Sequence, residues 1–242
     1  MTMLLLFVLF QVHAQLYVGI ETGANKNYLI TSNAAEAFTR YNSAPGLSFG
    51  IPVLLQVNEW FALQTAPSFT QKNFQIQRTD FFQGIYQKNI NGYLQLPILA
   101  NFSFGVGKIR GYINLGFYGA YWVSGRIKGT EANILNTSDT TTQNPTNILG
   151  EDNAYSYNQR YPFSSKDNRM EFGWIGGVGM SYQLNAYYRL FLEGVFISSL
   201  TDNQKNYQIN QIPRYNSTYG IEAGCLFLLY PTSIFKKKFH IF

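Results

Sequence analysis

Two neighbouring stretches of strict alternation constrain the fold of this chain more than any other feature. In residues 91–105 one face is wholly apolar, and it is formed by Leu94, Leu96, Ile98, Ala100, Phe102 and Phe104. After the short link 106–110 the alternation resumes over residues 111–124, with Ile113, Leu115, Phe117, Tyr121 and Val123 on one face. A side-chain period of two predicts a β-strand. Two adjacent strands, each longer than the usual five or six residues, match a hydrocarbon layer of about 30 Å, so we expect a membrane β-barrel.

The composition fits a barrel of this kind. Aromatic residues make up 17% of the 242 residues, while charged residues make up only 13%, about half the usual share. Abundant Tyr and Phe with few charges suit aromatic girdles around an apolar belt. A soluble all-β sandwich or a soluble ligand-binding barrel is the alternative, but the length of the strands and the shortage of charge count against both.

The charge and the cysteine content limit which classes of partner and cofactor we expect. The net charge of +5 is spread along the chain without a basic stripe carrying interleaved aromatics, so we expect no nucleic-acid partner. The one cysteine excludes an internal disulfide framework and a cysteine-rich metal site. We therefore expect no metal and no cofactor. The expected partners are outer-membrane lipids and other envelope proteins.

Both ends of the chain carry segments outside the expected barrel. Residues 1–14 read as a signal peptide, because an apolar run from Met3 to Phe10 precedes a small-residue ending at Ala14. Residues 230–242 are expected to form a periplasmic tail that carries Lys236, Lys237 and Lys238. This tail is either a frayed, solvated end or a segment that docks onto a partner.

The alternation extends to eight strands over residues 15–229. The expected strands are 15–27, 46–57, 61–77, 91–105, 111–124, 169–183, 189–202 and 215–229. Their connections alternate between long and short, as in all-β, up-and-down antiparallel outer-membrane barrels, whose short turns face the periplasm. The longest, 129–167, is then an external loop, whose Tyr and Phe side chains we expect to fold over the barrel or onto a partner. Pro52, Pro67 and Pro97 fall inside strands, so we expect bulges there.

Inward-facing charged residues form the candidate site. The alternation of side chains points three carboxylates inward: Glu21 on the first expected strand, Glu193 on the seventh and Glu222 on the eighth. These three strands become neighbours when the barrel closes. Carboxylates in a narrow lumen need hydrogen-bond or charge partners, and Arg189 and Arg110 are the candidates. We interpret this lumen carboxylate cluster as a network that plugs and rigidifies the barrel, because eight strands leave room only for side chains. A cation or proton path is the alternative.

Aromatic residues near strand ends are the expected membrane girdles. We assign Trp60, Trp174, Tyr182 and Tyr219 to them. Trp122 is the exception, because its parity points inward.

Several stretches resemble the PorT-like outer-membrane β-barrel family of Gram-negative bacteria. The similarity is carried by Tyr93–Leu99, Tyr112–Gly119, Phe172–Met180, Leu190–Gly194 and Tyr219–Gly224. It implies an eight-stranded barrel, with a role in secretion machinery in one branch and as an accessory subunit of envelope complexes in others. The chain departs from the family in continuing beyond Leu229.

Enzymatic activity is not expected. Barrel enzymes such as lipases and proteases use a histidine as base or partner. The two histidines here are His13, in the expected signal peptide, and His240, near the end of the tail. The sequence therefore predicts a non-enzymatic structural or accessory subunit of an envelope assembly, linked to secretion or outer-membrane biogenesis. A small-solute channel or binding barrel is the alternative, and adhesion through the external loops is a third possibility.

Overall fold

The computed structural model describes residues 15–31, 38–79, 84–132, 154–207 and 209–230. Within these residues the chain forms twelve β-strands joined in one antiparallel sheet. The strands are β1 (Gln15–Ile30), β2 (Thr39–Gly50), β3 (Val53–Gln56), β4 (Phe61–Thr65), β5 (Ser68–Gln71), β6 (Phe74–Arg78), β7 (Tyr86–Phe104), β8 (Ile109–Ala132), β9 (Ala154–Arg160), β10 (Met170–Gln183), β11 (Tyr188–Ser199) and β12 (Tyr215–Tyr230). In these ranges no helix is long and apolar enough to cross a membrane.

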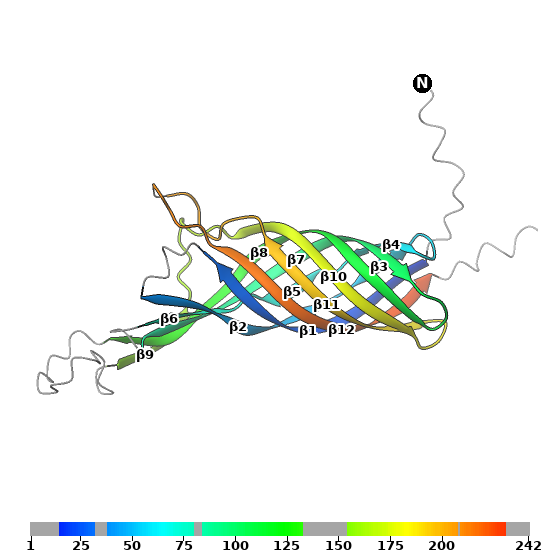
Figure 1. Ribbon diagram of the computed structural model, residues 1–242, viewed down its shortest axis with the longest axis horizontal. Coiled ribbons are helices and arrows are strands. Elements are labelled where there is room, and N and C mark those ends of the chain that lie inside the picture. Colours follow the sequence, from blue (N-terminus) through cyan, green and yellow to red (C-terminus); the bar gives the residue numbers. More distant parts are fainter. Residues whose placement is uncertain (1–14, 32–37, 80–83, 133–153, 208, 231–242) are drawn as a thin grey trace, which may run out of the picture.

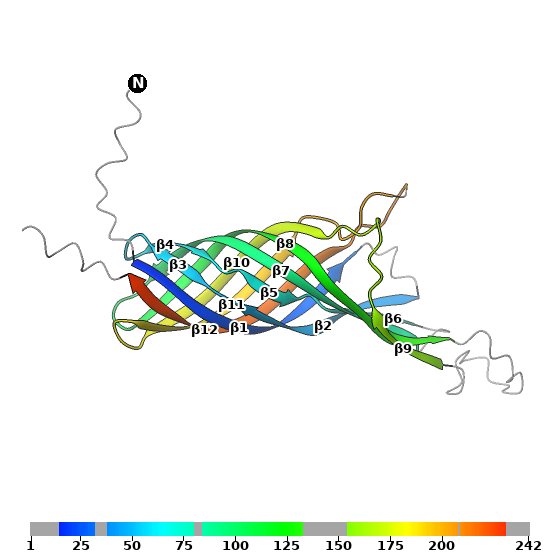
Figure 2. The same cartoon turned by 180° about the vertical axis from the view of Figure 1, so that it is seen from behind.

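The sheet closes into a barrel. β1 pairs with β12 from Leu16↔Tyr230 to Ile30↔Tyr215, so the first and last strands are neighbours (Figures 1 and 2). Collinear short strands share a position in this barrel: β2 and β3 lie beside β1, while β4, β5 and β6 follow one another along β7. With β7, β8, β10, β11 and β12 this makes eight positions among the described residues, and β9 pairs with the outer part of β8. The expected eight-stranded antiparallel barrel is confirmed.

Prolines account for the interruptions at two of the three expected places. The strands break at Pro52, between β2 and β3, and at Pro67, between β4 and β5. Across these breaks the carbonyl of Pro52 accepts from Gly19 N at 2.8 Å, and that of Pro67 accepts from Ile51 N at 3.0 Å. The expectation of a bulge at Pro97 is wrong, because β7 keeps its register with β8 through this residue.

The position of Pro97 explains why it is tolerated. Its carbonyl accepts a 2.6 Å hydrogen bond from the Thr65 hydroxyl, on the side of β4. In a strand the N–H and C=O of one residue point to the same side, so the missing N–H of Pro97 faces the break between β4 and β5. Because no strand residue pairs with Pro97 at this break, its missing N–H removes no hydrogen bond between strands.

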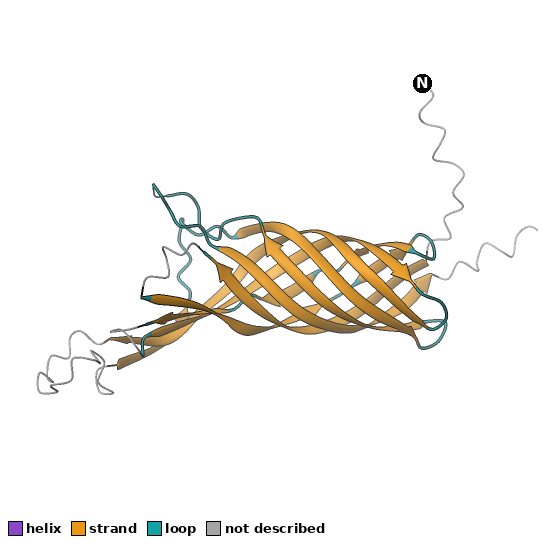
Figure 3. Ribbon diagram, viewed as in Figure 1, coloured by secondary structure: helices purple, strands orange, loops and turns teal. Residues whose placement is uncertain are grey.

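The strand limits differ from the expected ones mainly at one end. β8 runs to Ala132 and pairs with β9, so part of the region expected as the loop 129–167 is sheet. β6 and the first residues of β7 also extend beyond the barrel, and Figure 1 shows this projecting sheet. Turns 57–60, 105–108 and 184–187 are short and lie at the opposite end, beside Gln15 and Tyr230 (Figure 3).

The two faces of the sheet differ sharply in chemistry. Large apolar side chains on the outside are uncovered: on β7, for example, Leu94, Leu96 and Ile98 are 55%, 53% and 70% exposed. The inside is filled by buried aromatic, aliphatic and polar side chains in two apolar clusters. One cluster holds Tyr17, Leu54, Ala62, Tyr112, Phe191 and Leu226, and the other holds Tyr93, Leu99, Tyr118, Ala120, Trp122, Ile175, Val195 and Ile197. An uncovered apolar outer surface around a filled interior suits lipid as the surrounding medium.

Candidate functional site

Three carboxylates meet in the lumen, as their parity suggested. Glu193 and Glu222 lie directly opposite each other on β11 and β12, and Glu222 is opposite Gly23, two residues from Glu21. Glu193 accepts hydrogen bonds from Tyr112 OH at 3.1 Å and from Asn114 Nδ2 at 2.9 Å. Glu222 accepts from the Ser48 hydroxyl at 3.1 Å. Neutral donors on two strands, β8 and β2, therefore hold Glu193 and Glu222 in place.

The expected cationic partners of this cluster are elsewhere. The Arg189 guanidinium donates to Gln183 Oε1 at 2.9 Å, to Tyr17 OH at 3.1 Å and to Gln56 Oε1 at 3.1 Å. Arg110 donates to the carbonyl of Glu59 at 3.2 Å. The prediction that Arg189 and Arg110 pair with the carboxylates is wrong, because both lie near the short-turn rim, where hydroxyl, amide and carbonyl groups accept their hydrogen bonds.

A buried ion pair that we did not anticipate lies in the other half of the lumen. Lys72 Nζ contacts Glu171 Oε1, and the two side chains are 0% and 2% exposed. The ammonium also lies over the rings of Tyr118 and Tyr93, 4.6 and 5.2 Å from their centres. This is the one salt bridge among the described residues. It joins β10 to the end of β5 across the lumen.

Hydrogen bonds extend this pair into a network. Glu171 accepts from Tyr118 OH at 2.7 Å and from Asn216 Nδ2 at 2.6 Å. Asn216 Oδ1 in turn accepts from Asn27 Nδ2 at 3.0 Å, and Thr218 OH donates to Asn27 Oδ1 at 2.7 Å. Both carboxylate oxygens of Glu171 thus have donors, as a buried charge requires.

The signal for this network was present in the sequence. Lys72 and Glu171 both fall on lumen-facing positions of expected strands, and they carry opposite charges. What the sequence lacked was the height of each residue in the barrel, because the breaks around β5 shift its register.

Aromatic side chains close the lumen above this network. Trp122 points inward and stacks on Tyr93 at 5.9 Å, and Tyr161 and Phe163 pack on its ring at 4.8 and 4.9 Å. The guanidinium of Arg169 lies 4.3 Å from the centre of the Phe163 ring. We call Trp122, Tyr161, Phe163 and Arg169 the aromatic cap. The expectation that the long connection folds over the barrel is confirmed for Tyr161 and Phe163, whereas Tyr155 is exposed.

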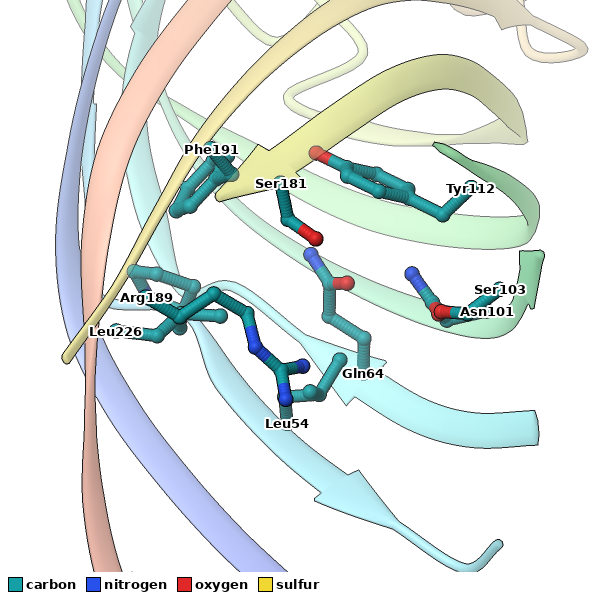
Figure 4. Close-up of a pocket in the computed structure, with 10 residues that line it drawn as sticks. Leu54, Gln64, Asn101, Ser103, Tyr112, Ser181, Arg189, Phe191 and Leu226 are labelled. Carbon is teal, nitrogen blue, oxygen red and sulfur yellow. The ribbon is translucent and has the colours of Figure 1, made fainter. Parts of the chain in front are cut away.

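At the short-turn end the lumen opens into a polar vestibule. Its volume is about 280 Å³, and its lining includes Lys108, Arg110 and Arg189. Deeper inside, Gln64, Ser181 and Arg189 point into a space of about 20 Å³ (Figure 4). That space holds about one water molecule, so it ends the vestibule.

Comparison with known proteins identifies the family. The model of the outer membrane protein β-barrel domain matches residues 11–205. The chain belongs to this family. No curated protein sequence matches it.

Solved structures of three outer-membrane proteins are also similar to this chain. Neisserial surface protein A is 13% identical with a TM-score of 0.41, and the match covers 88% of this chain and 96% of that chain. Ail of Yersinia pestis, solved with a heparin analogue, is 11% identical with a TM-score of 0.40 and coverage of 88% and 99%. The outer membrane protease OmpT of Escherichia coli is 9% identical with a TM-score of 0.40 and coverage of 89% and 96%.

Membership of this family places the barrel in the bacterial outer membrane. Short turns of such barrels face the periplasm and longer connections face outward. We therefore expect the vestibule to be periplasmic and the aromatic cap and the projecting sheet to be external.

The four expected girdle residues all lie on the outer face. Trp60 and Tyr182 are near the periplasmic rim, while Trp174 and Tyr219 are in the external half. Trp174 and Tyr219 both pack on Phe196, at 4.9 and 4.6 Å. Their role at the membrane–water interface stays a prediction, as do the signal peptide 1–14 and the tail lysines Lys236–Lys238, which lie outside the described residues.

Tyr161 makes the aromatic cap sensitive to alkali. Burial and the nearby Asp167 carboxylate, which accepts its hydroxyl at 3.0 Å, raise the pKa of Tyr161 to about 12 from 10. Because the folded pKa is the higher one, this contribution to stability is complete below pH 10 and is lost as the pH rises to about 12. We predict that protease resistance of residues 160–169 falls in this interval. Tyr161→Phe should remove this pH dependence; an unchanged profile in that variant would assign it to another group.

Proposed function

We propose that this outer-membrane barrel is a non-enzymatic structural or accessory subunit of an envelope assembly, of the PorT-like kind. The observation that carries the proposal is the filled lumen. The Lys72–Glu171 network and the aromatic cap occupy its external half, and the periplasmic vestibule ends at a space of about 20 Å³. A lumen filled in this way by the described residues favours a protein that acts through its surfaces.

The distribution of histidine supports a role without catalysis. Residues 15–230 contain no histidine, since the two in the sequence are His13 and His240. Histidine-dependent hydrolysis of the kind that membrane-barrel enzymes use would therefore lack its base on the strands.

The vestibule favours a second candidate, a small-solute binding barrel or channel. Its lining around about 280 Å³ carries three cations, Lys108, Arg110 and Arg189, against one acid, Glu59, and this excess of positive charge suits a small anion. A channel would additionally need the buried network to open.

A conductance measurement separates the two candidates. In planar bilayers we expect neither the wild-type barrel nor the variant Glu21→Gln/Glu193→Gln/Glu222→Gln to pass current, because the seal does not depend on these carboxylates. Solute flux through the wild-type protein, or a conductance gained by the variant, would favour the channel. An open porin in the same bilayers serves as the positive control.

Partner capture tests the accessory role itself. The full chain, tagged in an external loop, is expected to retain the same envelope proteins after extraction with two different mild detergents. Retention of lipids alone in both detergents would contradict the proposal.

A further inference from the structure

The outer face of the projecting sheet carries a dense group of cations. Lys88 on β7 lies directly opposite Lys128 on β8, and Arg126 on β8 lies directly opposite Arg160 on β9. Directly opposed side chains in an antiparallel sheet have Cβ atoms about 5 Å apart and point to the same face. We call these four residues the basic face. Arg126, Lys128 and Arg160 are exposed, and Lys88 is half-buried.

The basic face points away from the barrel axis, toward the side that faces lipid lower down. Gly92 marks this side, because a Cβ at Gly92 would touch the outward ring of Phe69 and the hydroxyl of Ser124. Lys88 lies four residues from Gly92, and Arg126 and Lys128 lie two and four residues from Ser124. Since side chains alternate along a strand, all of them share the outward side.

The height of the basic face follows from the same strands. Outward positions of β7 are apolar at Ile98, Leu96, Leu94 and Ile90, and the next one is Lys88. On β8 the apolar positions end near Tyr121, before Ser124 and Arg126. The cations therefore begin where the lipid-facing belt ends, on the external side of the membrane.

The cations have no counter-charge among the described residues. The one salt bridge there is the Lys72–Glu171 pair in the lumen, and the nearest acid on these strands, Glu131, has the opposite parity. Like charges directly opposite each other destabilise a sheet. An arrangement of two such pairs side by side is stabilised when an external anion lies across it.

We propose that the basic face binds the phosphate groups of a phosphorylated glycolipid in the outer leaflet. Such a lipid places its phosphates at the level where the apolar belt ends, and its acyl chains can lie along Leu94 and Ile90. Arginine forks match phosphate oxygens, and lysine adds mobile donors. A soluble polyanion offers the same charge without this fixed depth, which is why we assign the site to the lipid.

Binding of lipid A to the full-length barrel tests this proposal. The protein is placed in phosphatidylcholine nanodiscs that contain either bis-phosphorylated lipid A or lipid A without phosphates, and bound lipid per protein is measured by native mass spectrometry. The variant Arg126→Gln/Lys128→Gln is compared with Lys166→Gln/Lys205→Gln, which removes the same number of exposed charges elsewhere. The ratio between the two lipids cancels differences in folded fraction.

The expected result is a preference for the phosphorylated lipid that the first variant loses and the control variant keeps. Each basic residue near an anionic surface raises the affinity about fivefold, so the preference for the phosphorylated lipid should fall by at least about tenfold. An unchanged preference in the first variant, or an equal loss in the control, would overturn the proposal. Full competition by soluble inositol hexakisphosphate would overturn the lipid assignment and make a soluble polyanion the ligand.

Discussion

Lys72→Met is expected to lower the free energy of unfolding by about 3–5 kcal/mol, because it leaves the Glu171 carboxylate buried without its counter-charge. Glu171 is 2% exposed and cannot reach water without opening the barrel. Tyr118 and Asn216 would still donate to it, but two neutral donors do not replace an ammonium. Urea unfolding of the protein in lipid vesicles, followed by tryptophan fluorescence, measures the change.

Two further variants isolate the cause of this loss. Lys72→Met/Glu171→Gln removes both charges, so we expect it to recover most of the lost stability. Lys108→Met removes an exposed lysine and should stay within about 0.5 kcal/mol of the wild type. If the double variant were as unstable as Lys72→Met, packing around Lys72 rather than charge would be responsible.

Trp122→Ala is the second large effect, with an expected loss of about 3–5 kcal/mol. The indole is 5% exposed and contacts Tyr93, Tyr161 and Phe163, so its removal leaves a cavity between the lumen and the aromatic cap. Residues 160–169 should then become accessible to protease from outside the cell. The same unfolding assay, with proteolysis of intact cells, measures both consequences.

Trp60→Ala is the matched control for this prediction. It removes the same side chain from an outward position at the periplasmic rim, where the residue is 59% exposed. We expect a much smaller loss and no change in external proteolysis. Equal effects of the two substitutions would mean that Trp122 acts as a surface aromatic and not as part of the seal.

The sequence predicted the barrel because lipid imposes one rule on every strand. A lipid-facing position must be apolar, so parity along 91–105 and 111–124 assigned each side chain to the outside or the lumen. The same alternation placed the side chains of Trp122 and Glu193 inside, where the structure shows them buried.

The alternation of side chains does not predict how far along the barrel axis a residue lies. A residue's depth depends on strand stagger and on breaks such as those at Pro52 and Pro67, which composition does not encode. Arg189 was therefore paired with Glu193, although it bonds to Tyr17 near the rim, and the Lys72–Glu171 pair was missed. The extension of β8 to Ala132 was missed because outside the membrane the apolar alternation ends while the hydrogen-bonded ladder continues.

We expect lipid to cover the apolar outer face of these strands. To test this, single cysteines are placed at Leu96, Ile98 and Lys128 in a Cys225→Ser background, and each is labelled with a nitroxide. In vesicles, we measure how often each label collides with oxygen, which concentrates in lipid, and with a nickel complex, which stays in water. We predict that oxygen dominates at Leu96 and Ile98 and the nickel complex at Lys128. Dominance of nickel at Leu96 and Ile98, or exclusion of both agents by covering protein, would contradict the account.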